Sequence, residues 1–144
     1  MAIANLHETL LAYTMRKNGL QVEIAEAQTR KALAVAQRAD NNSLLSAGKA
    51  EIRNKYKAMY NADEEAFEAQ GYSDYTQIPD FEEEIDKITA QITDELNELA
   101  EWETQIDQQI TTDSAELEEI NAYMESMKNM LSSNIQEDFK FGLN

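Results

Sequence analysis

The chain has 144 residues, of which 42% are hydrophobic and 28% charged, and its formal net charge is −16. This charge repels a phosphate backbone, so we expect no nucleic-acid partner. The absence of cysteine excludes disulfides and thiolate metal sites, and one proline with only four glycines favours long helices over sheets.

Basic and acidic side chains are divided along the chain. Residues 1–60 hold nine Lys or Arg against five Asp or Glu, about +4, whereas residues 61–144 hold three against twenty-three, about −20. Two helical segments of opposite sign can pair within one chain or between copies. We therefore expect a mainly basic first arm and an acidic second arm that pair antiparallel, with surplus negative charge left over.

The first arm is predicted to be one long helix over about residues 2–70, which contain no proline. Its apolar residues recur at the three- and four-residue spacing of one helix face. The predicted interaction residues on this face are Leu6, Leu10, Leu20 and Ile24. Alanines at positions 25, 27, 32, 34, 36 and 39 would let another helix approach closely, although Ala is also the best helix former.

A polar cluster from Asp40 to Ser43 predicts a kink or short interruption of this helix within 40–48. Short oxygen-bearing side chains compete for backbone donors, which weakens a helix. Gly48 adds to this effect, because glycine costs a helix about 1 kcal/mol relative to alanine.

The clearest predicted loop covers residues 71–79, between the two arms. Gly71 is a candidate helix C-cap at its start, and the only proline, Pro79, stands at its end. Asp80, three residues before Glu83, forms a capping-box pattern, and residues 82–84 are all glutamate, the charge that a helix N-terminus favours. We expect a second helix to begin here.

The second helix is predicted over about residues 80–137, with the strongest apolar periodicity in the chain. Its predicted interaction residues are Ile85, Ile88, Ile92, Leu96, Leu99, Trp102, Ile106 and Ile110, and the pattern continues to Ile135 with one polar slot near Asp113. Fourteen steps from 85 to 135 average about 3.6 residues, the period of a straight helix. A break at 111–114 remains an alternative and would give a three-helix arrangement.

The tail, residues 138–144, carries Phe139 and Phe141. A spacing of two cannot place both rings on one helix face. The segment is therefore either a frayed terminus or a docking element that inserts both rings into a neighbour.

Motifs for catalysis or cofactor binding are missing. His7 is the only histidine, which excludes hydrolase triads within one chain and the Glu-x-x-His pairs of di-iron bundles. Residues 40–51 fail the calcium-loop pattern because Leu45 stands where glycine is needed, and no glycine-rich phosphate loop occurs. We expect no enzyme activity, no cofactor and no metal.

The general layout of the chain resembles bacterial axial filament subunits, such as flagellin ends and type III secretion needle and filament proteins. The shared features are long terminal amphipathic helices, no cysteine, few aromatics and a polar face rich in Gln, Asn and Ser. Residues 1–5 and 43–48 are similar to the early segment of flagellin, although its Asn-Arg-rich motifs are absent and the C-terminus differs. Residues 133–135 with 139–141 are similar to small uncharacterised bacterial helical proteins. The resemblance implies a self-assembling helical subunit and carries over no functional residue.

Together these patterns predict a single all-α domain over 1–144, a long antiparallel helical hairpin of coiled-coil type. The leading functional prediction is a structural or protein–protein interaction protein that forms homo-oligomers or pairs with a basic helical partner. The alternative is an acidic adaptor or export chaperone for a basic client. Because no apolar run approaches the roughly 20 residues of a membrane span and no signal-peptide layout occurs, we expect no membrane insertion and a chain that is soluble at synthesis; export without a signal stays open.

Overall fold

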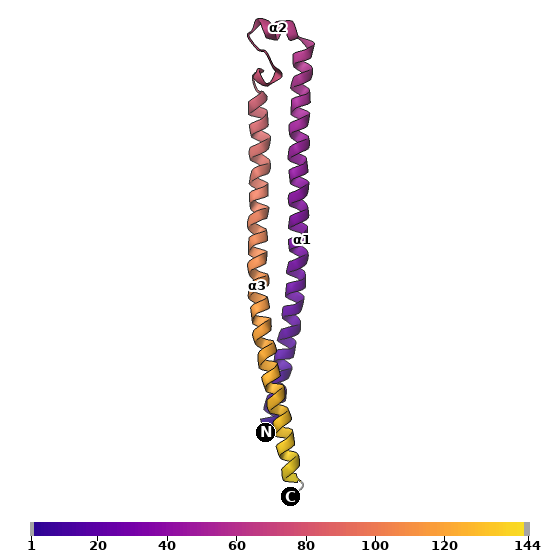
Figure 1. Ribbon diagram of the computed structural model, residues 1–144, viewed down its shortest axis with the longest axis vertical. Helices are drawn as coiled ribbons and strands as arrows, with labels where there is room; N and C mark the ends of the chain where they lie inside the picture. Colours follow the sequence, from indigo (N-terminus) through magenta and orange to yellow (C-terminus); the bar gives the residue numbers. More distant parts are fainter. Residues whose placement is uncertain (1, 143–144) are drawn as a thin grey trace. The chain divides into compact units, whose positions relative to one another are not determined.

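The computed structural model describes the backbone of residues 2–142 and the side chains of residues 3–137. The chain forms α1 (Ala2–Ala62), α2 (Glu64–Ala69), a short 3₁₀ helix η1 (Tyr75–Gln77) and α3 (Phe81–Gly142). The two long helices, α1 and α3, pack against each other in antiparallel directions (Figure 1). The prediction of an all-α helical hairpin is confirmed.

The chain divides into two compact units. Unit 1 consists of residues 1–31 and 105–144, and unit 2 of residues 32–104. Each unit pairs a segment of α1 with a segment of α3, and unit 2 also contains α2 and the connecting loop. The boundaries between the units fall inside the two long helices and not in a loop.

The predicted interruption within 40–48 is wrong, because α1 is helical from Ala2 to Ala62. The side chain of Asn41 explains this: its Oδ1 accepts a hydrogen bond from Gln37 Nε2 at 3.1 Å, and its Nδ2 donates to Glu95 Oε2 on α3 at 3.3 Å. An amide held by these side chains does not compete for the helix backbone. α3 is likewise helical through residues 111–114, so no break occurs there either.

The first long helix ends earlier than predicted, at Ala62 instead of about residue 70. Asp63 leaves the helical region with φ −132° and ψ 44°, and α2 follows as a separate helix. The change of direction lets the ring of Phe67 stack on Tyr60, with centroids 5.8 Å apart. In one straight helix these residues would stand about 10 Å apart along the axis.

Gly71 ends α2 as the sequence predicted. It has a φ of +91°, its N–H donates to the Glu68 carbonyl, and the N–H of Tyr72 donates to the Phe67 carbonyl. This pair of bonds is a Schellman cap, in which the left-handed conformation favours glycine.

Asp80, by contrast, has a φ of 75° and offers its backbone carbonyl to the N–H of Glu84, and no described bond joins its carboxylate to Glu83.

The seam between the long helices has the period of a coiled coil. Buried and half-buried positions on α1 alternate every three and four residues from Ile3 to Ile52, fourteen steps in 49 residues or 3.5 per step. Those on α3 alternate in the same way from Leu96 to Asn134. A period of 3.5 is typical of left-handed coiled coils, so the predicted period of 3.6 is wrong. The difference in the average came from ending the series at Ile135, which is exposed, instead of at Asn134.

The backbone of the predicted tail is helical as far as Gly142, because α3 continues to that residue. The side chains of Phe139 and Phe141 lie outside the described residues. Whether they dock into a neighbour therefore stays a prediction.

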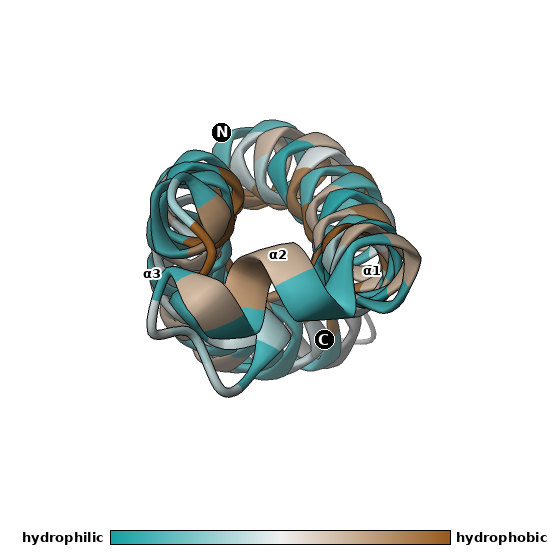
Figure 2. Cartoon of the chain, turned by 90° about the horizontal axis from the view of Figure 1, so that it is seen from above, coloured by the Kyte–Doolittle hydropathy of each residue, from teal (hydrophilic) through white to brown (hydrophobic). Residues whose placement is uncertain are grey.

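Each unit has its own apolar cluster. In unit 1 the cluster consists of Leu20, Ile120 and Met124, with half-buried neighbours on both helices. In unit 2 it consists of Tyr56, Ile78 and Phe81, which come from α1, the loop and α3. Figure 2 looks down on the loop side of unit 2, where α2 crosses between the ends of α1 and α3.

Candidate interaction surfaces

The apolar residues predicted for interaction lie in the intramolecular seam. Leu20 and Ile106 are buried, and most of the others are half-buried: Leu6, Leu10, Ile24, Ile85, Ile88, Ile92, Leu96, Leu99 and Ile110. Trp102 differs, because 42% of it is exposed. With that exception, the described members of the set serve first to pack α1 against α3.

Ala27, Ala34 and the polar slot at Asp113 were expected from the sequence, but other polar and small members of this seam were not predicted. On α1 these are Lys17, Lys31, Arg38, Asn41 and Gly48, and on α3 they are Glu103 and Asn134. A search for apolar residues alone passes over them. The strict seven-residue spacing of positions 13, 20, 27, 34, 41 and 48 was the signal that could have found those on one edge of the α1 seam.

The buried carboxylate of Glu103 is held by an ion pair within unit 2. Arg38 Nη1 lies 2.6 Å from Glu103 Oε2, and only 11% of the Glu103 side chain is exposed. A buried charge without such a partner would be costly, whereas a paired one fixes how the helices align. Glu103 therefore occupies a core position with its charge satisfied.

A shallow groove beside this pair is lined by Gln37, Asn41, Glu95, Leu99 and Trp102, with Glu98 at its edge, and has a volume of about 410 Å³. The bond from Asn41 to Glu95 crosses it from α1 to α3. Three of its polar side chains, Gln37, Asn41 and Glu95, are thus engaged with each other.

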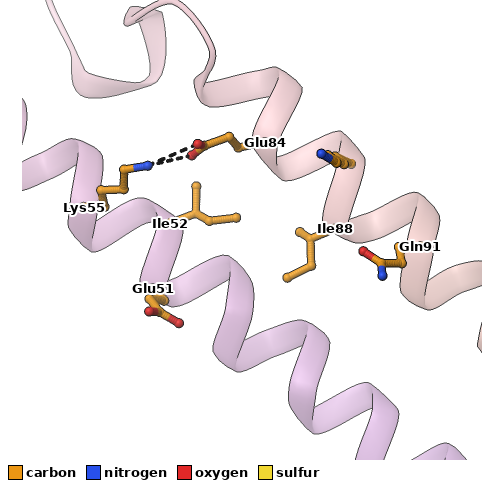
Figure 3. Close-up of a pocket in the computed structure, with 7 residues that line it drawn as sticks. Glu51, Ile52, Lys55, Glu84, Ile88 and Gln91 are labelled. Atoms are coloured by element: carbon orange, nitrogen blue, oxygen red, sulfur yellow. Dashed lines mark hydrogen bonds and ion pairs between the residues drawn. The ribbon is translucent and has the colours of Figure 1, made fainter.

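A second groove in unit 2, of about 440 Å³, lies between α1 and α3 (Figure 3). Lys55 Nζ donates to both oxygens of Glu84, at 3.1 and 3.4 Å. The hydrogen bond from Lys55 lowers the pKa of Glu84 and in turn raises the pKa of Lys55. Both groups are therefore charged near neutral pH, and their pairing leaves little net charge to attract a ligand.

Gly48 lies next to this groove, opposite Ile88. A Cβ atom placed on Gly48 would overlap Cδ1 of Ile88, so the isoleucine occupies the space that a larger residue would need. Gly48 thus marks a close contact between α1 and α3, whereas from the sequence it was predicted only to weaken the helix. Here the advantage of glycine lies in packing and not in φ.

Unit 1 contains an unsatisfied buried acid. Asp113 is 8% exposed, and its Oδ2 has no hydrogen-bond partner among the described residues. Nearby, the Arg16 guanidinium binds Glu116 through two hydrogen bonds of 2.9 Å, Nε to Oε1 and Nη2 to Oε2. Hydrogen bonding from Arg16 lowers the pKa of Glu116 and raises the pKa of Arg16. Arg16 therefore pairs with Glu116 and not with Asp113.

The described side chains form no group of three or more His, Asp or Glu residues that could hold a metal ion. No helix within the part of the chain that the structure describes is both long and apolar enough to cross a bilayer. Comparisons with protein-family models, with curated proteins and with solved structures gave no match. The surfaces of the two helices are therefore the features from which a function can be inferred.

Proposed function

We propose that this chain is a structural or protein–protein interaction protein that self-associates through the faces of its long helices. The observation that supports this most strongly is an inversion of the usual pattern. Several large apolar side chains stand exposed, while small and polar ones occupy the middle of the α1 seam.

The middle of the α1 seam shows the inversion clearly. Ala27 and Ala34 are buried there, and the seam positions between and after them are Lys31, Arg38 and Asn41. Each fully buried Leu or Ile would contribute about 1.5–3 kcal/mol, which alanine and these polar residues do not supply. The hairpin alone therefore buries little apolar surface for its length, and association would bury more.

The exposed apolar residues supply that additional surface. Leu11, Met15 and Leu33 on α1 expose 56%, 69% and 62% of their surface, and on α3 Ile135 exposes 52%. Single exposed apolar residues are common, whereas contiguous apolar faces are typical of interaction sites. A filament subunit, as the resemblance to axial filament proteins implies, is the sharper version of this proposal.

Sedimentation velocity over a range of protein and salt concentrations tests the proposal. We expect the average mass to rise with protein concentration. We also expect association to strengthen as salt screens the net charge of −16 that repels identical copies. A particle that stays monomeric at every concentration and salt would contradict self-association, and micrographs without polymers under all ionic conditions would remove the filament version.

A second candidate function, an acidic adaptor that binds a basic client, is favoured by the charge of α3. Four of its carboxylates form ion pairs with α1 among the described residues: Glu84, Glu103, Asp107 and Glu116. Most of the twenty-three acidic residues after position 60 are left over. Binding to a basic client would weaken as salt rises, whereas self-association would strengthen, so the sign of the salt effect separates the two proposals.

A further inference from the structure

One face of α1 in unit 1 is exposed, uncharged and studded with apolar side chains. We call it the outer strip, and its members are Leu11, Met15, Asn18, Gly19, Val22 and Ala25, all exposed. They follow the three- and four-residue spacing of one helix face. Leu11, Met15 and Val22 expose 56%, 69% and 56% of their surface.

The outer strip faces away from α3. Val22 follows Leu20 by two residues, which turns it by about 200° around the helix. Leu20 is the fully buried side chain at the centre of the unit 1 cluster. The packing of α1 on α3 therefore does not account for the apolar character of this strip.

Gly19 is a second feature of the strip that packing within the described chain does not explain. A glycine within a helix is less favourable than alanine, and a Cβ placed on Gly19 would meet no described atom within 4 Å. Nothing within the described chain requires a glycine here. A backbone approached closely by another helix does require one.

The sizes of the strip residues fit a second copy of the same strip in antiparallel orientation. A two-fold axis between residues 18 and 19 places Met15 opposite Val22, and it places Leu11 level with Glu26 and one residue away from Ala25 of the other copy. It also places Asn18 opposite Gly19. Large side chains at one end of the strip then meet smaller ones at the other, which is the self-complementarity of an isologous dimer.

The charges at the ends of the strip agree with this arrangement. Glu8 and Arg30 are exposed, and neither forms an ion pair among the described residues; Arg30 Nη2 donates to the neutral side chain of Gln109 at 3.2 Å. The same two-fold axis brings Glu8 of each copy near Arg30 of the other. It also keeps the acidic α3 segments on the far sides of the two α1 helices, where their repulsion is weakest.

We infer that the outer strip of α1 is the surface through which two copies of this chain associate, antiparallel and centred on residues 18 and 19. This inference rests on the proposed self-association and specifies where it takes place.

The test compares Met15→Glu with Met130→Glu by sedimentation equilibrium. Both variants replace an exposed methionine of unit 1 by glutamate and add one negative charge, but only Met15 lies in the strip. We expect Met15→Glu to raise the dissociation constant by roughly tenfold or more, because it buries a charge at the interface. Met130→Glu should change it little, and circular dichroism should show equal helix content in both.

Charge reversal tests the antiparallel register. We expect Arg30→Glu to weaken association and the double variant Glu8→Arg with Arg30→Glu to restore it. If the wild-type chain associates but Met15→Glu and Met130→Glu are equal, the strip is not the interface and self-association stands. If the wild-type chain is monomeric throughout, both proposals fail. If Arg30→Glu weakens association and the double variant does not restore it, the antiparallel register is wrong.

Discussion

The apolar clusters of the two units are built from different kinds of residues. In unit 2, Tyr56 and Phe81 meet edge to face with centroids 5.3 Å apart, and Tyr75 meets Phe81 in the same way at 5.5 Å. The connecting loop supplies Ile78 to this cluster. In unit 1 no loop is available, and the cluster of Leu20, Ile120 and Met124 joins residues about one hundred positions apart along the chain.

The two units therefore differ in how completely the chain itself covers their apolar surface and pairs their buried acids. Unit 2 has a chain segment that covers its apolar cluster, and its buried acid Glu103 is paired with Arg38. The described part of unit 1 consists of two helix segments, with a buried acid that has no hydrogen-bond partner among these residues and an uncharged apolar strip on its outer surface. We therefore regard the loop end of unit 2, around Tyr56 and Phe81, as self-sufficient, whereas unit 1 and the middle of α1, where Leu33 is exposed, would gain from association.

The largest predicted effect is on the aromatic cluster of unit 2. Replacing Phe81 by alanine removes two ring contacts from a buried position and should lower the free energy of unfolding by about 3–5 kcal/mol. Trp102→Ala is the control within unit 2, because 42% of Trp102 is exposed, and it should cost about 1–2 kcal/mol. Urea denaturation measures both; equal losses would show that the cluster does not dominate unit 2.

The second prediction concerns the unpaired acid of unit 1. Asp113→Leu should raise the free energy of unfolding by about 1–2 kcal/mol, because it replaces a buried carboxylate oxygen that lacks a partner. Asp107→Leu is the matched control on α3: Asp107 Oδ1 is 2.7 Å from Lys31 Nζ, so this variant should be neutral or slightly destabilising. A loss of stability in Asp113→Leu would mean that Asp113 has a stabilising role.

The third prediction compares one glycine from each unit. In the monomer, at protein concentrations too low for association, Gly19→Ala should stabilise unit 1 by about 0.5–1 kcal/mol, because alanine favours the helix and the space is open. Gly48→Ala should gain little or nothing, because Ile88 must leave its position, at a rotamer cost of about 0.5–1.5 kcal/mol. Ile88→Val removes the obstructing methyl, so a double-mutant cycle should recover the gain at Gly48. Equal gains at both glycines in the wild-type background would contradict the close contact.

The features that the sequence predicted well depend on local chemistry. The Gly71 cap, the loop before α3 and the helical periodicity follow from glycine, proline and apolar spacing in one segment. The errors lie where the partner helix decides: Asn41 stays in a continuous helix because Glu95 and Gln37 bind its side chain, and Glu103 replaces Trp102 in the seam because Arg38 can pair with it. Such pairings become visible only when polar and small residues are counted as members of the heptad.

The smallest predicted effect concerns the pKa of one paired carboxylate in each unit. In unit 1, Arg16→Met should return the pKa of Glu116 toward its ordinary value of 4.5, because hydrogen bonding from Arg16 is the main cause of its lowering. In unit 2, Lys55→Met should leave the pKa of Glu84 partly lowered, because the hydroxyl of Tyr56 in the aromatic cluster also favours its charged form. Side-chain carboxyl NMR titrations measure both values.

The sign of the linked effect on stability follows from the direction of these shifts. A carboxylate whose pKa is lower in the folded state adds stability above its ordinary pKa, and that contribution disappears as the pH falls through the folded value. Both pairs are solvent-exposed, so the loss on acidification should be small and should shrink further at high salt. A full return of Glu84 to its ordinary pKa in Lys55→Met would show that the aromatic cluster does not reach this carboxylate, and the electrostatic difference between the units would then disappear.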